Sequence, residues 1–392
     1  MLGLGRQMKT VDFKAYADQY NELAGKLLKY CCSATDGENV VISPLSILLL
    51  LSIAADSTAG KTREEMLSFL GNPEANMMLN RLQKDLSGDH SLAVANAVCV
   101  RKDKAPTIQM SYKDLILPAY RAELFTSADL ARDVNAWVEK KTNGLISVAA
   151  PENIGDVLMC LMSAVAFDAA WTDPYEDEDV RDRYFTNADG TKSRVWMLYG
   201  SEWSYIENDD FTGFTKSYRN SDLTFMALLP KQKGREAMAE AIERIDFGKL
   251  CRSGSYLDVH TSMPEFKFEF AQELSALCKA FGINDVFTDH ADFSPASTYP
   301  LKLDSILHKA FIDVNQEGTR AAAVTLAYAV AGCCPPRDFK EVHIDRPFIF
   351  AIVDREAGIP VFTGVVNHLE DEKADPERLK RKLLRNRKLW SE

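Results

Sequence analysis

An alternation of small and larger side chains between Thr319 and Val330 is the most informative pattern along the chain. Every second position, counted from Thr319, holds Thr or Ala, whereas the positions between them are mostly larger. Successive side chains of a strand point to opposite faces, so this pattern predicts a strand with one uniformly small face toward a crowded core. Pro335 and Pro336 would end ladder pairing. The segment is therefore able to enter the middle of a sheet as far as about residue 332.

Helical periodicity predicts several helices. Within residues 12–30, aromatic and aliphatic side chains recur three and four positions apart, which is typical of an amphipathic helix. Ser43 before Pro44 has the composition of an N-cap followed by proline at the first helical position. Thr62 and Glu65 have the spacing of a capping box. The expected helices cover residues 12–30, 44–55, a segment that opens at Thr62, 134–141 with a C-cap at Asn143-Gly144, and 272–281.

Apolar runs predict strands between these helices. Leu161 to Phe167 is almost entirely apolar, as expected for a central strand buried on both faces. From Phe266 onward, Phe recurs at every second position, which predicts a strand with one apolar face. Strands and helices are mixed without regular alternation, so the sequence predicts an α+β fold rather than a doubly wound sheet. The other expected strands cover residues 40–42, 92–100, 223–229, 349–353 and 361–366.

The length of 392 residues would allow two or three domains, but the sequence contains no linker at which the chain could be divided. We therefore expect one domain over residues 1–369 and a charged tail over residues 370–392. In this tail Leu379, Leu383 and Leu384 lie among Lys and Arg residues. Such a segment either forms a basic amphipathic helix that binds anionic surfaces or the acidic body of the protein, or it is a solvated tail. The second alternative is the one we expect.

Composition narrows the classes of partner. The net charge of −11 argues against a nucleic-acid-binding protein, because phosphate contacts need a basic surface. No apolar run approaches the length that spans a membrane. No spacing typical of a metal site occurs, so we expect no metal or other cofactor. The hydrophobic fraction of 46% supports a substantial core.

The cysteines and the first residues bear on the compartment. The chain has eight cysteines, and we expect free thiols because a chain of this length needs no disulfide framework. Residues 1–9 lack the apolar core of a signal peptide. We expect an extracellular protein whose leader has been removed, with a cytoplasmic protein as the alternative.

Glu317-Gly318-Thr319 followed by Arg320 and the run Ala321, Ala322 and Ala323 resembles the hinge of the reactive-centre loop of the serpins, which are conformationally trapping inhibitors of proteases. Further similar motifs, in chain order, lie at 41–47, 60–66, 96–97, 134–144, 167–190, 287–294, 308–310, 346–348 and 362–364. The resemblance covers roughly residues 12–369. It implies a single domain with a large central mixed sheet, additional smaller sheets, about eight or nine helices and an exposed reactive-centre loop at about 316–340. We expect this protein to be a monomer.

The resemblance also implies two sites at which the large sheet opens. Ser43, Ser46 and His308 fall at the shutter, where the sheet must part, and Ser163 stands where the family usually has Asn. We expect His308 to be a buried structural residue rather than a catalyst. Trp171 falls at the breach, where the loop first enters the sheet.

Two departures from the family pattern meet at the breach. The hinge begins with Gln316 instead of an acidic residue, and Glu265 replaces a basic one. If the two positions meet, a Gln–Glu contact replaces a salt bridge. Arg320 stands where the family usually has Glu, and the alternation places it on the outward set of side chains, so insertion should tolerate it.

By analogy with the family, the scissile bond lies fourteen residues after the hinge Gly318, between Gly332 and Cys333. The bonds Ala331–Gly332, Val330–Ala331 and Cys333–Cys334 remain open, because loop lengths vary. Residues flanking the bond are Tyr328, Ala329, Val330, Ala331 and Cys334. Ala329 to Gly332 are small and uncharged, which favours a shallow elastase-like or subtilisin-like pocket.

We therefore expect an inhibitor of serine proteases with small-residue pockets, with cysteine proteases as a further class of partner. A non-inhibitory serpin that acts as a binding protein or chaperone is the alternative, which Arg320 and the altered breach keep open. An enzyme is not expected, since no G-x-S-x-G elbow is present. Cys333 and Cys334 are expected to be exposed loop residues, whose oxidation would switch inhibition off.

Overall fold

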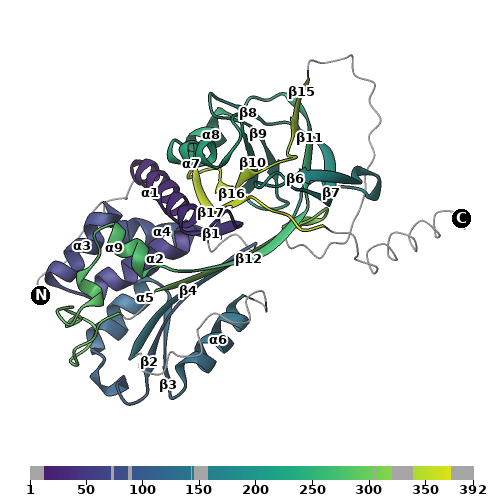
Figure 1. Ribbon diagram of the computed structural model, residues 1–392. Helices are drawn as coiled ribbons and strands as arrows, with labels where there is room; N and C mark the ends of the chain where they lie inside the picture. The colour runs from purple at the N-terminus through teal and green to yellow at the C-terminus, as the bar shows by residue number, and fades with distance from the viewer. Residues whose placement is uncertain are drawn as a thin grey trace, which may run out of the picture.

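The computed structural model describes residues 13–71, 75–86, 91–142, 144, 158–303, 306–319 and 339–371. Figure 1 shows most helices gathered at one end of the molecule and most strands at the other, with long strands running between the two ends. Within the described residues the α-helices are α1 (Phe13–Ala34), α2 (Pro44–Asp56), α3 (Gly60–Leu70), α4 (Ala75–Leu86), α5 (Leu117–Ala119), α6 (Leu130–Lys141), α7 (Arg235–Glu243), α8 (Phe247–Ser253) and α9 (Ser275–Ala280).

The strands form four sheets, and shorter helical turns lie between them. The turns that matter below are η3 (Asp177–Asp179) and η4 (Asp285–Phe287). The strands are β1 (Val40–Ile42), β2 (Leu92–Arg101), β3 (Ala122–Ser127), β4 (Met159–Phe167), β5 (Ala169–Ala170), β6 (Val180–Thr186), β7 (Lys192–Glu202), β8 (Tyr205–Glu207), β9 (Phe211–Ser217), β10 (Leu223–Pro230), β11 (Asp258–Pro264), β12 (Phe266–Glu273), β13 (Leu307–Val314), β14 (Gly318–Thr319), β15 (Phe339–His343), β16 (Phe348–Asp354) and β17 (Ile359–Val366).

The six-stranded sheet β1-β17-β16-β10-β9-β8 forms the centre of the core. Every residue of β10, β16 and β17 is buried, as the apolar runs in the sequence predict. Gly364 is required in β17, because a Cβ there would lie 2.2 Å from the carbonyl oxygen of Val40 on the neighbouring strand β1.

Two further sheets lie next to each other and form one layer. One has the order β3-β2-β4 and the other the order β12-β13-β14-β5. Strand β4 leads into β5 with only Asp168 between them. Strands β4 and β13 contact each other, yet among the described residues no ladder pair joins them. The layer is mixed, because β2 pairs with β3 in parallel and with β4 in antiparallel orientation. The fourth sheet, β15-β11-β7-β6, is mixed as well.

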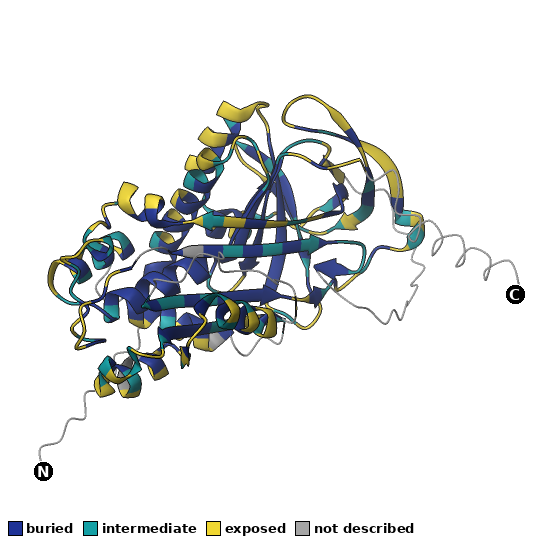
Figure 2. Cartoon of the chain, turned by 60° about the horizontal axis from the view of Figure 1, so that its bottom comes forward, coloured by how far each residue is buried: buried dark blue, intermediate teal, exposed yellow. Residues whose placement is uncertain are grey.

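Helices cover this layer on both faces. Figure 1 shows α6 beside β2, β3 and β4. Its Val134 and Trp137 belong to a separate apolar cluster with side chains of β2 and β4, among them Ala97, Met162 and Ala164. Helix α2 packs against β4 and β17. It is buried on all sides from Pro44 to Ala55, as a uniformly apolar helix must be. Figure 2 shows the buried residues as a continuous dark blue interior.

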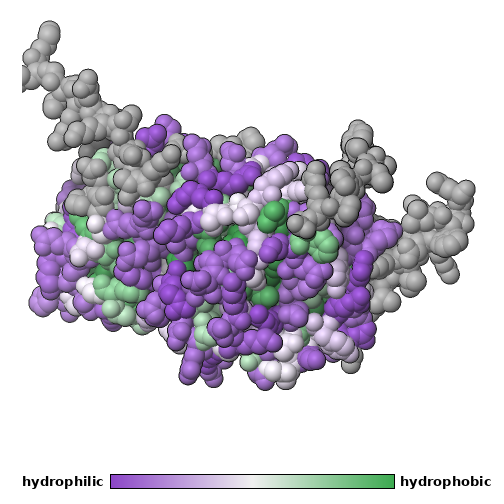
Figure 3. All heavy atoms as spheres, turned by 90° about the horizontal axis from the view of Figure 1, so that it is seen from above, coloured by the Kyte–Doolittle hydropathy of each residue, from purple (hydrophilic) through white to green (hydrophobic). Residues whose placement is uncertain are grey.

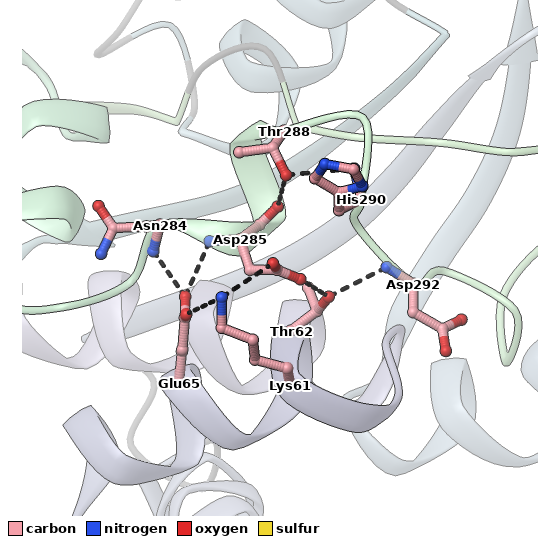
Figure 4. Close-up of polar contacts among 8 residues, drawn as sticks. All are labelled: Lys61, Thr62, Glu65, Asn284, Asp285, Thr288, His290 and Asp292. Atoms are coloured by element: carbon pink, nitrogen blue, oxygen red, sulfur yellow. Dashed lines mark hydrogen bonds and ion pairs between the residues drawn. The ribbon is translucent and has the colours of Figure 1, made fainter.

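The capping-box prediction at Thr62 was wrong. Helix α3 begins earlier, at Gly60, after the extended residue Ala59. The Thr62 hydroxyl instead donates to Asp285 at 2.5 Å, and Glu65 accepts from the backbone N–H groups of Asn284 and Asp285 (Figure 4). The polar spacing therefore serves a tertiary contact between α3 and η4 rather than the end of its own helix.

The helix predicted over residues 272–281 is shorter than expected. Strand β12 continues through Glu273, and α9 covers only Ser275–Ala280. The carboxylate of Glu273 accepts hydrogen bonds from the backbone N–H groups of Ser275 and Ile306, which fixes the turn between strand and helix. The other helices and strands predicted before residue 319 and after residue 339 are present with boundaries shifted by a few residues. The strand predicted from Thr319 to Val330 lies outside the described residues beyond Thr319. In the part of the chain that the structure covers, no helix combines the length and the apolar character needed to cross a membrane.

Candidate functional site

The predicted hinge forms a short strand in the layer made by the sheets β3-β2-β4 and β12-β13-β14-β5, which we call the large layer. Gly318 and Thr319 form β14, which lies between β13 and β5. Thr319 pairs with Val314 of β13 and with Ala169 of β5, in antiparallel orientation on both sides. Because β5 continues β4, a chain that went on past Thr319 in the same direction would run along the seam between β4 and β13.

A tight turn at Asn315 directs the chain into this position. The side-chain oxygen of Asn315 accepts hydrogen bonds from the backbone N–H groups of Glu317 at 2.9 Å and Gly318 at 3.2 Å. The backbone N–H of Asn315 donates to the carbonyl of Gly318 at 2.9 Å. An Asn side chain that bonds its own backbone two residues on is a common turn device, and here it reverses the chain from β13 into β14.

Trp171 forms two hydrogen bonds to the backbone of this turn. Its indole N–H donates to the carbonyl of Asn315 at 3.0 Å, and its backbone N–H donates to the carbonyl of Glu317 at 3.0 Å. The Trp171 ring is fully buried and stacks on Tyr218, with ring centroids 4.6 Å apart. The predicted breach residue therefore contacts the hinge through hydrogen bonds and supports it by packing.

Gln316 and Glu265 are in contact, but it is the backbone of Gln316, not its side chain, that binds the Glu265 carboxylate. One carboxylate oxygen of Glu265 accepts from the backbone N–H of Gln316 at 3.0 Å, and Glu265 is buried. The side-chain amide of Gln316 turns instead to Asp177 in η3, at 3.3 Å. An acidic residue at position 316 would face both carboxylates, so the amide fits this site better than the acid that is usual in the family.

Thr319 closes the upper end of the seam. Its side chain is buried, and its hydroxyl lies 2.5 Å from the Tyr218 hydroxyl. Thr319 is the first of the alternate small residues of the loop, and the neighbouring Gly318 is buried as well. Phe167, Phe311, Ile312, Asp313, Ile352 and Phe362 lie around Thr319 at the seam.

A buried ion pair beneath the hinge was not anticipated from the sequence. Lys216 and Glu202 are both almost entirely buried, and their charged atoms are 2.7 Å apart. The ammonium of Lys216 lies 4.3 Å from the centre of the Tyr175 ring, and the backbone N–H of Tyr175 donates to the carbonyl of Gln316. The sequence does carry a signal, because Lys216 lies two residues after the buried Phe214 and so shares its face of β9.

The shutter residues connect the start of α2 to both strands of the seam. The backbone N–H of Ser43 donates to Nε2 of His308 on β13 at 3.2 Å. The hydroxyl of Ser46 donates to the carbonyl of Ser163 on β4 at 3.4 Å. Burial lowers the pKa of His308 to about 4, so its ring is neutral and accepts this bond at physiological pH. The Ser163 hydroxyl is buried and has no hydrogen-bond partner among the described residues.

The predicted reactive bond falls outside the described residues. This holds for Gly332 and Cys333, for the flanking residues Tyr328 to Ala331 and Cys334, and for the hinge residues from Arg320 to Ala323. The basic tail after Asp371 falls outside them as well. The described residues therefore include the first four residues of the predicted hinge and the residues predicted for the breach and the shutter.

The described cysteines are poor nucleophiles. Cys31, Cys32, Cys99, Cys160, Cys251 and Cys278 are free thiols. Burial raises the pKa of Cys31 and of Cys278 to about 12, so these thiols stay protonated at neutral pH. Within the described ranges, no group of three or more His, Cys, Asp or Glu side chains is arranged to hold a metal ion.

Comparison with known proteins decides the family. Residues 18–369 match the family described as serpin, serine protease inhibitor. The chain belongs to the serpin family. It is 30% identical to Serpin-Z10 of Arabidopsis thaliana over 382 residues, which cover 89% of this chain and 97% of the relative. Serpin-Z2A of Triticum aestivum is 31% identical over 369 residues, which cover 84% of this chain and 90% of that one.

Solved structures agree with the assignment. The native state of the thermophilic serpin Tengpin superposes with a TM-score of 0.83 at 31% identity, covering 92% of this chain and 96% of that one. Its latent state superposes with a TM-score of 0.78, covering 92% of this chain and 100% of that one. Human thyroxine-binding globulin, at 22% identity and a TM-score of 0.81, covers 92% of this chain and all of that one and shares the fold.

The fold and family predictions are confirmed. The chain is an α+β serpin with several sheets, and members of this family act in general as inhibitors of proteases rather than as catalysts. The residues proposed for the reactive bond, the extent of the domain and the compartment stay predictions.

Proposed function

We propose that this serpin is a suicide-substrate inhibitor of serine proteases with small-residue pockets, of the elastase-like or subtilisin-like kind. The protease attacks the reactive-centre loop and forms an acyl-enzyme. Cleavage frees the loop, which inserts into the large layer as an additional strand and carries the attached protease with it.

The position of β14 carries this proposal. Both residues of β14 pair with β5, and Thr319 also pairs with β13. Strands β4 and β13, which lie beyond them, share no ladder pair among the described residues. A loop released by cleavage would extend β14 along this seam and pair with both neighbours. The small residues at alternate positions from Thr319 would then face the core.

The free energy available is sufficient. A strand of about a dozen residues forms on the order of ten ladder bonds, each worth roughly 0.5–1.5 kcal/mol net, which sums to about 10 kcal/mol. That is comparable with the whole stability of an ordinary domain. Insertion can therefore distort the attached protease, and the native state before cleavage must be held kinetically.

The first experiment is equimolar incubation with elastase and with subtilisin, followed by a denaturing gel and mass spectrometry of the released C-terminal peptide. A band at the summed mass that survives denaturation establishes trapping, and the first residue of the peptide identifies the scissile bond. Cleavage without a complex would mean that the chain is only a substrate of that protease.

A matched pair of variants tests insertion itself. The alternation places Ala323 on the inward set and Val324 on the outward set. Ala323→Arg should convert the protein from an inhibitor to a substrate, because a charge would have to enter the core. Val324→Arg should leave trapping intact. Equal behaviour of the two variants would contradict insertion in this register.

A non-inhibitory binding protein or chaperone is the second candidate. Arg320 in the hinge and the exchanged charges at the breach favour it. It predicts that no protease in a panel with small, basic and aromatic pockets forms a stable complex, while the loop is cleaved or left untouched.

A further inference from the structure

Exposed aromatic side chains gather at one end of the sheet β15-β11-β7-β6. Trp203, Tyr256, Leu257 and Phe339 are among the large hydrophobic residues that the structure leaves exposed, at 45%, 80%, 36% and 52%. Trp203 stacks on Tyr256 with ring centroids 5.5 Å apart, and His260 stacks on Phe339 at 4.5 Å. We call Trp203, Tyr256, Leu257, His260 and Phe339 the aromatic patch.

The strand register brings these residues together. Phe339, the first residue of β15, pairs with Asp258, the first residue of β11. Glu202 at the end of β7 pairs with Val259, so Trp203 follows at the same edge. In Figure 1, β15 and β11 lie at the top of the molecule, and Figure 3 looks onto this end, where hydrophobic residues gather amid hydrophilic ones.

His260 and Phe339 of the aromatic patch do not pack into the core beneath their own sheet. Val259, Thr261 and Val342 occupy the alternate positions of β11 and β15 and are buried on the inner face. His260 and Phe339 lie on the opposite, solvent-facing side. Exposed clusters of large aromatic residues on a folded protein mark binding surfaces, because Trp and Tyr contribute much of the energy of protein interfaces.

The place of the patch in the chain indicates its partner. Phe339 follows the predicted scissile residue Cys333 by six positions. An extended chain spans about 3.3 Å per residue, so a bound protease would hold its active site within about 20 Å of Phe339. A protease body is broader than that, so its surface beside the cleft would reach the patch. Because Phe339 lies after the bond, this surface is on the side that receives the residues released by cleavage.

We propose that the aromatic patch is a second docking surface for the protease that the reactive-centre loop engages, an inference that rests on the proposed inhibitory function. The patch takes an apolar area of the protease beside its active-site cleft. Asp258 and Glu341 lie on the same side of the sheet as His260, so the matching area is rimmed by Lys or Arg. The uncharged residues around the predicted bond offer little selectivity, and this surface would supply it.

The test separates docking from cleavage of the loop. The patch variant, Trp203→Ala with Tyr256→Ala, removes the stacked pair of rings from the aromatic patch, and both positions are distant in sequence from the loop. The control variant, Tyr184→Ala with Tyr299→Ala, removes two aromatic residues that are also exposed, at 61% and 41%, elsewhere on the surface. For each protein we would measure the association rate constant with a protease it traps, and the Kd for the same protease with its catalytic Ser replaced by Ala. A peptide of residues 320–338 measures cleavage of the loop alone.

The patch variant is expected to associate about tenfold more slowly and to bind the inactive protease about tenfold more weakly. Its stoichiometry of inhibition and its melting temperature should match those of the control. Association unchanged from the control would overturn the proposal. So would a wild-type dimer in sedimentation velocity that the patch variant dissociates, since the patch would then join two copies of the chain.

Failure of the proposed function gives a different result. If no protease is trapped but the inactive protease still binds, and the patch variant weakens that binding, docking at the patch stands and trapping fails. If none of the small-pocket proteases binds in either form, the docking proposal is overturned together with the inhibitory one.

Discussion

The hydroxyl groups of Tyr218 and Thr319 lie 2.5 Å apart in the buried upper end of the seam. This bond ties the last described residue of the hinge to the end of β9. Tyr218 is also packed between Phe167 and Trp171, with ring centroids 4.7 Å and 4.6 Å away. The tyrosine thus joins strand β4, the breach and the hinge at the point where insertion would begin.

Removing one partner of this bond should destabilise the protein more than removing both. Tyr218→Phe leaves the buried hydroxyl of Thr319 without its partner, which costs about 1–3 kcal/mol, and Thr319→Val does the same to Tyr218. The double variant should be close to wild type, since two apolar groups then meet. Urea unfolding of the four proteins measures the coupling. Costs that simply add would show that the bond contributes nothing.

Glu265→Ala should loosen the hinge. It removes the acceptor for the backbone N–H of Gln316, which lies 3.0 Å from the carboxylate. An unsatisfied buried donor costs about 1–3 kcal/mol, so local opening should become roughly 5- to 150-fold more frequent. Hydrogen exchange of the peptide that contains residues 315–319 measures this opening. Glu265→Gln keeps an acceptor oxygen and should stay near wild type; equal exchange in the two variants would argue against the contact.

Acid should destabilise the native state through His308. Burial lowers the pKa of His308 from 6.5 to about 4, so below pH 6.5 the unfolded chain binds a proton that the native state rejects. The free energy of unfolding should therefore fall as the pH falls from about 6.5 toward 4, by about 2 kcal/mol between pH 7 and pH 5 from this group.

The matched variants His308→Gln and His260→Gln isolate that contribution. Gln at position 308 can still accept from the Ser43 N–H but does not titrate. Urea unfolding gives the free energy of unfolding at pH 7 and at pH 5, and the difference between the two should be about 2 kcal/mol smaller in His308→Gln than in wild type. The half-exposed His260 is the control. A pH dependence that persists undiminished in His308→Gln would assign it to other groups.

Lys216→Met should be strongly destabilising. Lys216 and Glu202 are 2.7 Å apart and almost fully buried, and burial raises the pKa of Glu202 while Lys216 lowers it. Removing the cation leaves a buried carboxyl group without its counter-charge, which costs about 3–5 kcal/mol. Lys216→Met combined with Glu202→Leu should recover most of the loss, because well-packed apolar pairs replace buried ion pairs at little cost. Thermal unfolding compares the three proteins, and a single variant as stable as wild type would refute the prediction.

Local signals predicted the elements whose causes are local. Ser43 accepts from the backbone N–H of Ser46 as the expected N-cap of α2, and Gly144 adopts a left-handed conformation after α6. Thr62 failed because its spacing to Glu65 fits both a cap and a tertiary contact. In the folded chain the Thr62 hydroxyl donates to Asp285 and accepts from the backbone N–H of Asp292, rather than from that of Glu65. Sequence spacing alone cannot show which partner a hydroxyl takes when one of the partners comes from a distant part of the chain.

The candidate site was predictable only in part, for the same reason. The motifs placed Trp171, Glu265 and Gln316 near one another, but not the use of the backbone N–H by Glu265 or the turn of the Gln316 amide to Asp177. The buried Lys216–Glu202 pair joins two strands that are neighbours only after the chain has folded.

The sequence by itself determined the family, the α+β class and the small-residue alternation that makes loop insertion sterically feasible. These properties depend on side-chain size, periodicity and ordered motifs, which are written along the chain. Only the tertiary structure showed that Gly318 and Thr319 pair as strand β14 between β13 and β5. It also showed that β4 and β13 share no ladder pair among the described residues. Strand pairing and the burial of charge depend on which distant segments of the chain meet in the fold, and spacing along the sequence does not record those meetings.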